Sequence, residues 1–106
     1  MIKNSKVAII IVNWKQYELT KSCLLSLKKI NCVDHQIILI DNESNQKELK
    51  SIKNQFENIV TFSNETNLGF TGANNIGIKH AIKNKFEYVM LINNDTEVEK
   101  NFINPL

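Results

Sequence analysis

Arginine is absent from this sequence. All 13 basic residues are lysines, and with 11 acidic residues they give a formal net charge of +2. So small a charge does not favour a nucleic acid or an anionic membrane as a partner. Without arginine, a phosphate group also lacks the planar fork of donors that usually binds it at two points. We therefore expect any phosphate bound here to depend on a metal ion, with a lysine such as Lys15 contributing only a point charge.

Long apolar runs and paired cysteines are missing as well. The longest early apolar run, Val7–Val12, has six residues, too few for a signal-peptide core or a membrane span. Cys23 and Cys32 form no CxxC pair and have no neighbouring pair of histidines. We interpret them as reduced thiols of a cytoplasmic protein.

The overall composition is that of a small soluble globular domain. The chain has 106 residues, 42% hydrophobic and 23% charged, which is enough for one domain with a modest core. It contains 16 asparagines and 15 isoleucines, a compositional bias. An individual asparagine is therefore weak evidence of function unless its position makes it informative.

Four apolar segments predict strands of a buried sheet, because continuous β-branched runs are typical of strands covered on both faces. These segments are Val7–Val12, Gln36–Ile40, Asn58–Phe62 and Phe86–Ile92.

Apolar residues at helical spacing lie between these segments and predict three amphipathic helices. The helical stripes are Leu19, Cys23, Leu27 and Ile30; then Leu49, Ile52 and Phe56; then Ala73, Ile76, Gly77, His80 and Ala81. Asn45 followed by Glu48 resembles a capping box at the start of the second helix. A loop, Ser63–Gly72, precedes the third, whose small residues should let it lie close to the sheet.

This alternation predicts an α/β fold of the Rossmann-like kind: a four-stranded parallel sheet flanked by helices in three α/β/α layers. Because parallel strands share a direction, Asn13, Asp41, the Asn67–Gly72 loop and Asp95 should meet at one edge of the sheet. A dinucleotide-binding oxidoreductase has the same architecture but needs a glycine-rich turn after the first strand. Here that turn, Asn13–Gln16, contains no glycine, which argues against such an enzyme.

Four motifs occur in order from Val7 to Glu97: VAIIIVNW, IILIDNES, NLGFTGANNIGIKHA and MLINNDTE. Together they resemble the donor-binding half of a family 2 glycosyltransferase, most closely the bacterial rhamnosyltransferase-like branch. The resemblance implies a GT-A fold and inverting transfer from a nucleoside-diphosphate sugar, with UDP, dTDP or GDP as the nucleotide. It also implies a saccharide or lipid-linked acceptor and a role in cell-wall or surface polysaccharide biosynthesis.

The same resemblance assigns roles to individual residues. Asn13 and Trp14 lie where the family's base pocket begins, and Asp41 matches the aspartate that accepts a hydrogen bond from the base. Asn93-Asn94-Asp95 occupies the DxD position, with Asp95 as the ligand of Mg²⁺ or Mn²⁺. Since Asn93 replaces the first aspartate, metal binding should be weaker than with two carboxylates.

Gly72, Asn75 and Asn94 complete the predicted nucleotide-binding set. Ordinary structural roles remain open for several of these residues. Asp41 and Asn75 are good helix-capping residues, Gly72 suits a tight connection, and Trp14 is equally suited to packing on the first helix.

The chain's end raises the last expectation. Asn104-Pro105 has the pattern of a helix start, one residue before the sequence stops. We therefore expect residues 1–106 to be a truncated nucleotide-sugar-binding part, inactive alone because the acceptor half and the catalytic base would lie beyond it. The alternative is a non-catalytic nucleotide-sugar-binding or interaction module. An exposed sheet edge would then favour self-association, and a missing segment could attach the protein peripherally to the inner face of the membrane.

Overall fold

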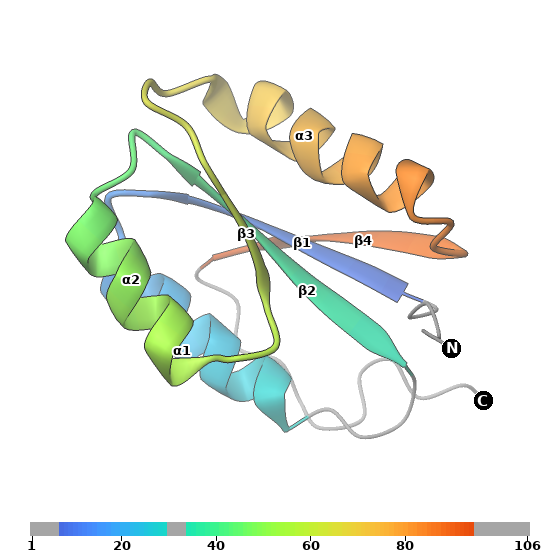
Figure 1. Cartoon of the computed structure of the whole chain (residues 1–106), viewed down its shortest axis with the longest axis horizontal. Helices are drawn as coiled ribbons and strands as arrows, with labels where there is room; N and C mark the ends of the chain where they lie inside the picture. The colour runs from blue at the N-terminus through green and yellow to red at the C-terminus, as the bar shows by residue number, and fades with distance from the viewer. Residues whose placement is uncertain (1–6, 30–33, 95–106) are drawn as a thin grey trace.

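The computed structural model describes residues 7–29 and 34–94, and it has the predicted alternation of strands and helices (Figure 1). The elements are β1 (Val7–Trp14), α1 (Tyr17–Lys28), β2 (His35–Asn42), α2 (Gln46–Gln55), β3 (Val60–Ser63), α3 (Gly69–Lys83) and β4 (Tyr88–Asn93). All strand pairs are parallel, in the order β3-β2-β1-β4. The predicted α/β fold with a four-stranded parallel sheet is confirmed.

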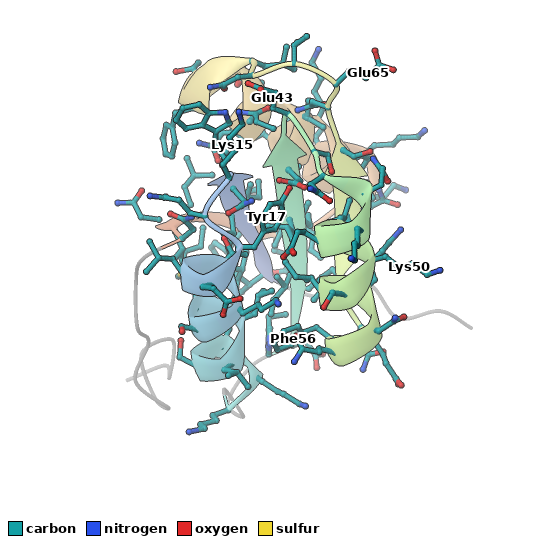
Figure 2. All side chains as sticks on the ribbon, turned by 90° about the vertical axis from the view of Figure 1, so that its left-hand side faces the viewer. Lys15, Tyr17, Glu43, Lys50, Phe56 and Glu65 are labelled. Atoms are coloured by element: carbon teal, nitrogen blue, oxygen red, sulfur yellow. The ribbon has the colours of Figure 1, made fainter. Side chains whose placement is uncertain are left out.

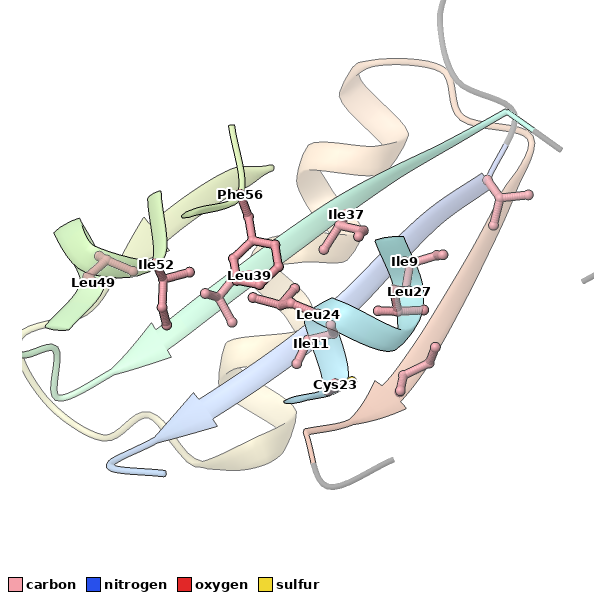
Figure 3. Close-up of a cluster of buried hydrophobic side chains, with 12 residues drawn as sticks. Ile9, Ile11, Cys23, Leu24, Leu27, Ile37, Leu39, Leu49, Ile52 and Phe56 are labelled. Carbon is pink, nitrogen blue, oxygen red and sulfur yellow. The ribbon is translucent and has the colours of Figure 1, made fainter. Parts of the chain in front are cut away.

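Helices cover both faces of this sheet, α1 and α2 on one side and α3 on the other (Figure 1). The alternation of side chains along a strand explains why both faces are apolar. In β1, Ile9 and Ile11 face α1 and α2, whereas Ala8 and Ile10 face α3. The larger core cluster, on the side of α1 and α2, includes Leu24, Leu27, Leu39, Leu49, Ile52 and Phe56 (Figure 3).

The third helix lies very close to the sheet, as its small residues predict. A Cβ atom at Gly77 would meet the Ile10 side chain at 2.8 Å, closer than real contacts allow. Ala73 and Ala81, on the same buried face, are 0% and 1% exposed. Glycine and alanine therefore set the distance between α3 and the central strands.

The predicted cap of the second helix is also present. The Asn45 side chain accepts a hydrogen bond from the Glu48 amide at 3.2 Å, which satisfies one of the free N–H groups at the start of α2.

Several expectations were wrong in detail. Leu19 is not part of the inward stripe of α1: it is 43% exposed, and Thr20 and Leu24 are buried instead. The third helix begins at Gly69, so Gly72 belongs to its first turn rather than to the preceding loop. β3 is shorter than expected, running from Val60 to Ser63.

The fourth strand differs most, because it is not buried on both faces. Tyr88, Val89 and Leu91 are 60%, 41% and 47% exposed. Within residues 7–29 and 34–94, β1 is the only strand that pairs with β4, and α3 lies mainly over β1 and β2. Self-association through this edge stays a prediction. None of the described helices is long and apolar enough to cross a membrane.

Candidate nucleotide site at the carboxyl edge of the sheet

The strand register brings the predicted polar residues to one edge of the sheet. Asn13 pairs with Asp41, and Trp14 with Asn42, at the ends of β1 and β2. On the other side of β1, Val12 pairs with Asn93 near the end of β4. The chain leaves β1 for β2 on one side and reaches β4 on the other. This is the topological switch point at which open α/β sheets bind ligands.

Asp41 lies at the centre of a hydrogen-bond network beneath this edge. Its side chain is fully buried and accepts from Asn13 Nδ2 at 2.9 Å, the Tyr17 hydroxyl at 2.8 Å and Ser44 Oγ at 2.7 Å. The Tyr17 oxygen in turn accepts from the Asn45 amide at 2.9 Å. The carboxylate therefore joins β1, α1 and the start of α2. Direct contact between Asp41 and a base stays a prediction.

Burial raises the pKa of the Tyr17 phenol above its usual 10.0. The hydrogen bond from the Asn45 amide opposes this rise, whereas the hydrogen bond to the Asp41 carboxylate and its negative charge add to it. The phenol is therefore held as a neutral donor to Asp41.

A second part of the network reaches β4 through Asn13 and Thr20, both fully buried. Asn13 Oδ1 accepts from Thr20 Oγ1 at 2.6 Å, and the Asn94 side-chain amide lies 3.4 Å from the same oxygen. Asn94 Nδ2 also lies within 3.2 Å of Thr20 Oγ1 and 3.3 Å of Gln16 Oε1. Asn94 is therefore held at the edge by β1 and α1.

Asn42 fixes the loop before α3. Its Oδ1 accepts from Asn64 Nδ2 at 2.8 Å and from the Leu68 amide at 3.4 Å. Its Nδ2 donates to Asn67 Oδ1 at 3.1 Å and to the Gly69 carbonyl at 3.3 Å. A single buried amide thus ties the end of β2 to the first residue of α3.

A hollow of about 220 Å³ opens over these groups. Its lining residues are Val12, Trp14, Gln16, Asn42, Asn67, Gly69, Phe70 and Asn94. Trp14 and Phe70 are 49% and 55% exposed, so each offers accessible aromatic surface at the hollow. Flat aromatic side chains of this kind bind nucleic-acid bases by stacking.

Three charged and aromatic side chains cluster beside the hollow. Glu43 accepts from Trp14 Nε1 at 3.2 Å and forms an ion pair with Lys15 at 3.0 Å. The hydrogen bonds from Lys15 and Trp14 and the Lys15 charge hold the pKa of Glu43 below its ordinary value. Lys15 and Glu43 have φ angles of 59° and 51°, a left-handed conformation that non-glycine residues rarely adopt. Figure 2 shows Lys15 and Glu43 together at one end of the molecule, with Tyr17 below them.

The predicted site residues are thus distributed unevenly. Trp14 and Asn94 line the hollow, whereas Asn13 and Asp41 lie buried in the network that supports it. Gly72 and Asn75 lie in the first two turns of α3 and are not among the lining residues. Asn75 is exposed, while its neighbour Asn74 is only 4% exposed, and its Nδ2 has no hydrogen-bond partner among residues 7–29 and 34–94.

Sequence reasoning missed Tyr17, Thr20, Asn42 and Phe70. Of these four residues, Asn42 could most easily have been predicted from the sequence, because it directly follows Asp41 at the end of a predicted strand. The roles of Tyr17 and Thr20 depend on which face of α1 meets the sheet. The predicted apolar stripe wrongly included Leu19, so it placed a different face of the helix against the sheet.

The donor set for a metal ion is incomplete within the described ranges. Residues 7–29 and 34–94 contain no group of three or more His, Cys, Asp or Glu side chains placed to hold one. The Glu43 carboxylate is already paired with Lys15, and that of Asp41 accepts three hydrogen bonds. The predicted ligand, Asp95, follows Asn94 directly in the sequence and lies outside the described residues. A site that uses one carboxylate with water and phosphate oxygens suits Mg²⁺ or Mn²⁺.

A larger hollow of about 560 Å³ lies at the opposite, amino-terminal end of the sheet. Leu24, Ile37, Phe56 and Ile59 give it apolar walls, and Lys28, His35 and Glu57 lie around it. It lies away from the network that surrounds Asp41.

Comparison with known proteins identifies the family. The sequence model of the glycosyl transferase family 2 matches residues 8–106 of the chain. The chain belongs to this family. The match confirms the resemblance at family level but does not test the rhamnosyltransferase-like branch. No curated protein sequence matches the chain significantly.

Solved glycosyltransferases have the same fold. The chain superposes on S. aureus TarS 1-349 with a TM-score of 0.78 at 21% identity, covering 92% of this chain and 30% of that one. A TarS 1-349 structure in complex with UDP gives a TM-score of 0.75, also at 21% identity, covering 90% and 29%. The mannosyltransferase PcManGT from Pyrobaculum calidifontis, in complex with GDP-Man and Mn²⁺, gives 0.71 at 14% identity, covering 88% and 28%. The chain thus spans about 30% of the length of TarS 1-349, and at these identities the likeness concerns the GT-A fold.

Proposed function

We propose that residues 1–106 form the donor-binding part of a glycosyltransferase that uses a nucleoside-diphosphate sugar. The observation that carries this proposal is the hollow at the switch point of the sheet, flanked by Trp14 and Phe70 and supported by the Asp41 network. Membership of glycosyl transferase family 2 supports it independently.

In this proposal the base lies between the two aromatic side chains, and Asn42 and Asn67 beside it supply polar atoms for recognition. Asp41 acts chiefly by holding Asn13 and Tyr17, so that the ends of β1 and α1 keep their shape when the hollow fills. Asn94 marks the side of the site toward β4, where the diphosphate and the sugar would extend.

We propose Mg²⁺ or Mn²⁺ as the cofactor, with Asp95 as its carboxylate ligand. When bound, such an ion would offset the charge of the diphosphate as a Lewis acid. The absence of arginine from the whole sequence makes this contribution more important, because Lys15 is a point charge already paired with Glu43. PcManGT, which shares the fold, is seen with GDP-Man and Mn²⁺.

The finer features of the reaction are also proposals. We infer inverting transfer to a saccharide or lipid-linked acceptor, as in the rhamnosyltransferase-like branch that the motifs resemble. We also propose that the general base and the acceptor pocket lie outside residues 1–106, so that this part alone would bind the donor without transferring the sugar.

Calorimetry with UDP, dTDP and GDP, each with and without Mn²⁺, tests this proposal. We expect one nucleotide to bind with Mn²⁺ and more weakly without it, and Asp95→Ala to remove the metal-dependent part only. Glu57→Ala, at the opposite end of the sheet, is the matched control and should bind as the wild type does. If none of the three nucleotides binds under either condition, the proposed function is wrong.

A further inference from the structure

Trp14, which lines the hollow, also belongs to a cluster with Lys15 and Glu43 that is separate from the hydrogen bonds around Asp41. Both Glu43 oxygens are engaged: Oε1 accepts from Trp14 Nε1 at 3.2 Å, and Oε2 lies 3.0 Å from Lys15 Nζ. Lys15 Nζ also lies 5.7 Å from the centre of the Trp14 ring. The three side chains therefore form a closed group in which each contacts the other two.

The backbone beneath this cluster is unusual at two matched positions. Trp14 and Asn42 are register partners, so Lys15 and Glu43 are the next residues after the paired ends of β1 and β2. Their φ angles, 59° and 51°, lie in the left-handed region that favours glycine, and each costs conformational energy. Glycine would remove that cost at position 43, but it would also remove the carboxylate that holds Trp14 and Lys15.

The strained backbone places the Glu43 carboxylate beside the ligand hollow. Trp14 lines the hollow and is 49% exposed, and its indole N–H is held by the Glu43 carboxylate at 3.2 Å. The Glu43 amide also donates to the Thr66 carbonyl at 3.4 Å. Glu43 thus connects the aromatic wall on β1 to the loop that leads to the other aromatic wall, on α3.

We propose that Glu43 is a positioning residue for nucleotide binding, which holds the Trp14 ring at the wall of the site through its indole N–H. This inference rests on the proposed function and deepens it. Glu43 itself contacts no ligand: its two oxygens are engaged by Trp14 and Lys15. Its effect is to restrict the ring to one orientation before the base arrives, so that less freedom is lost on binding.

Three substitutions at position 43 separate this role from a purely structural one. Glu43→Gln keeps an acceptor for the Trp14 N–H and keeps the backbone strain, but loses the charge that pairs with Lys15. Glu43→Ala loses the acceptor and keeps the strain. Glu43→Gly loses the acceptor and relieves the strain. If Glu43 had only a structural role, the alanine and glycine variants would differ in Trp14 fluorescence and nucleotide affinity. If Glu43 positions Trp14, these two variants should behave alike in both measurements, and the glutamine variant should be closer to the wild type.

The readout in the free protein is the fluorescence of Trp14, the only tryptophan in the sequence. We expect lower anisotropy and stronger quenching by acrylamide in both Glu43→Ala and Glu43→Gly, with Glu43→Gln close to the wild type. Affinity for the nucleotide that the wild type binds should fall about fivefold in Glu43→Ala and Glu43→Gly, a typical effect of losing one hydrogen bond to a charged group at a partly exposed site. Thermal stability should be higher in Glu43→Gly than in Glu43→Ala.

Glu57→Gln, which removes one negative charge at the far end of the sheet, is the control. It should change neither the Trp14 fluorescence nor the nucleotide affinity. The proposal is overturned if Glu43→Ala and Glu43→Gly leave Trp14 anisotropy and quenching unchanged. It is also overturned if nucleotide affinity follows thermal stability, so that Glu43→Gly binds the nucleotide more tightly than the wild type does. Failure of the wild type to bind any nucleotide would refute the proposed function and, with it, this role in binding. The fluorescence result would then report only on how Trp14 is held in the free protein.

Discussion

At the carboxyl ends of the strands, buried side chains from β1, β2 and α1 are joined by hydrogen bonds beneath a hollow of about 220 Å³. At the amino ends, a hollow of about 560 Å³ is bordered by core residues such as Leu24 and Phe56. The larger hollow therefore occurs where the core is merely incompletely covered. The smaller one occurs where polar groups are fixed in place, and fixed polar groups are what specific ligand binding requires.

This contrast gives different expectations for stability and for binding at the two ends. Substitutions at the amino end should cost stability alone. Those at the carboxyl end should cost stability and nucleotide affinity together. The following substitutions test that division.

Asp41→Ala should have the largest effect. The substitution leaves Asn13 Nδ2, the Tyr17 hydroxyl and Ser44 Oγ without their acceptor, and the first is fully buried. We expect a loss of about 3 kcal/mol in the free energy of unfolding, since a buried unsatisfied donor costs about 1–3 kcal/mol. Urea denaturation measures the stability, and calorimetry should show that UDP binding is weakened at least about tenfold.

Asp41→Asn is the matched control for this substitution, because it keeps the shape and one acceptor oxygen. It should fall between the wild type and Asp41→Ala in both measurements. An Asp41→Ala protein as stable as the wild type would show that the network does not hold the edge together.

Leu24→Ala tests the amino end. The Leu24 side chain is fully buried and borders the larger hollow, so its loss enlarges a space that already exists. We expect destabilisation of about 2 kcal/mol, at the lower end for a buried leucine, because the site is partly open. UDP affinity should stay within about twofold of the wild type when measured well below the melting temperature. Weakened binding to a folded Leu24→Ala protein would remove the distinction between the two ends.

Tyr17→Phe should have a smaller effect at the carboxyl end. It removes one of the three donors to Asp41, at 2.8 Å, and the acceptor of the Asn45 amide, at 2.9 Å. Since Tyr17 is only half-buried, water can replace part of these two hydrogen bonds. We therefore expect the free energy of unfolding, measured by urea denaturation, to fall by about 1 kcal/mol. Phe56→Leu, at the amino end, is a useful comparison, because it should cost stability without affecting the start of α2.

The smallest effect should be the pH dependence contributed by Tyr17. Burial raises the pKa of its phenol above 10.0 in the folded protein, so folding favours the protonated form. The corresponding stability is fully present below pH 10.0 and is lost as the pH rises through the folded-state pKa. The tyrosinate absorbance of the wild type minus that of Tyr17→Phe should therefore have its midpoint above pH 10.0. A midpoint at or below the ordinary value would show that the phenol is not held as a neutral donor.

The fold could be predicted because its signals are local. Val7–Val12 and Gln36–Ile40 are short segments rich in β-branched residues, and parallel pairing follows from the helices between them. The exposure of β4 could not be predicted in this way, because the run Val89–Ile92 has the same composition as a covered strand. The exposure of Val89 and Leu91, on the face that α3 covers, depends on where α3 crosses the sheet, and α3 is close to β1 at the contact of Gly77 with Ile10.

The site could be predicted in part for a related reason. Parallel strands bring Asn13 and Asp41 together whatever the details of packing, and their hydrogen bond of 2.9 Å confirms that neighbourhood. The roles of Tyr17 and Thr20 depend on the rotation of α1, and the difference between buried Asn74 and exposed Asn75 depends on the phase of α3. If the predicted helix phase is wrong by one residue, a buried position is mistaken for its exposed neighbour. The predicted roles of Asp95 stay predictions.

The most direct test is a titration of the ¹⁵N-labelled chain with UDP, dTDP and GDP in turn, each in the presence of Mg²⁺, followed by amide chemical shifts. We predict that the shifts change at Val12–Gln16, Asn42 and Asn67–Phe70, around the smaller hollow, while those of His35 and Phe56 at the amino end stay unchanged. Changes concentrated around the larger hollow, or no changes with any of the three nucleotides at saturation, would contradict this prediction.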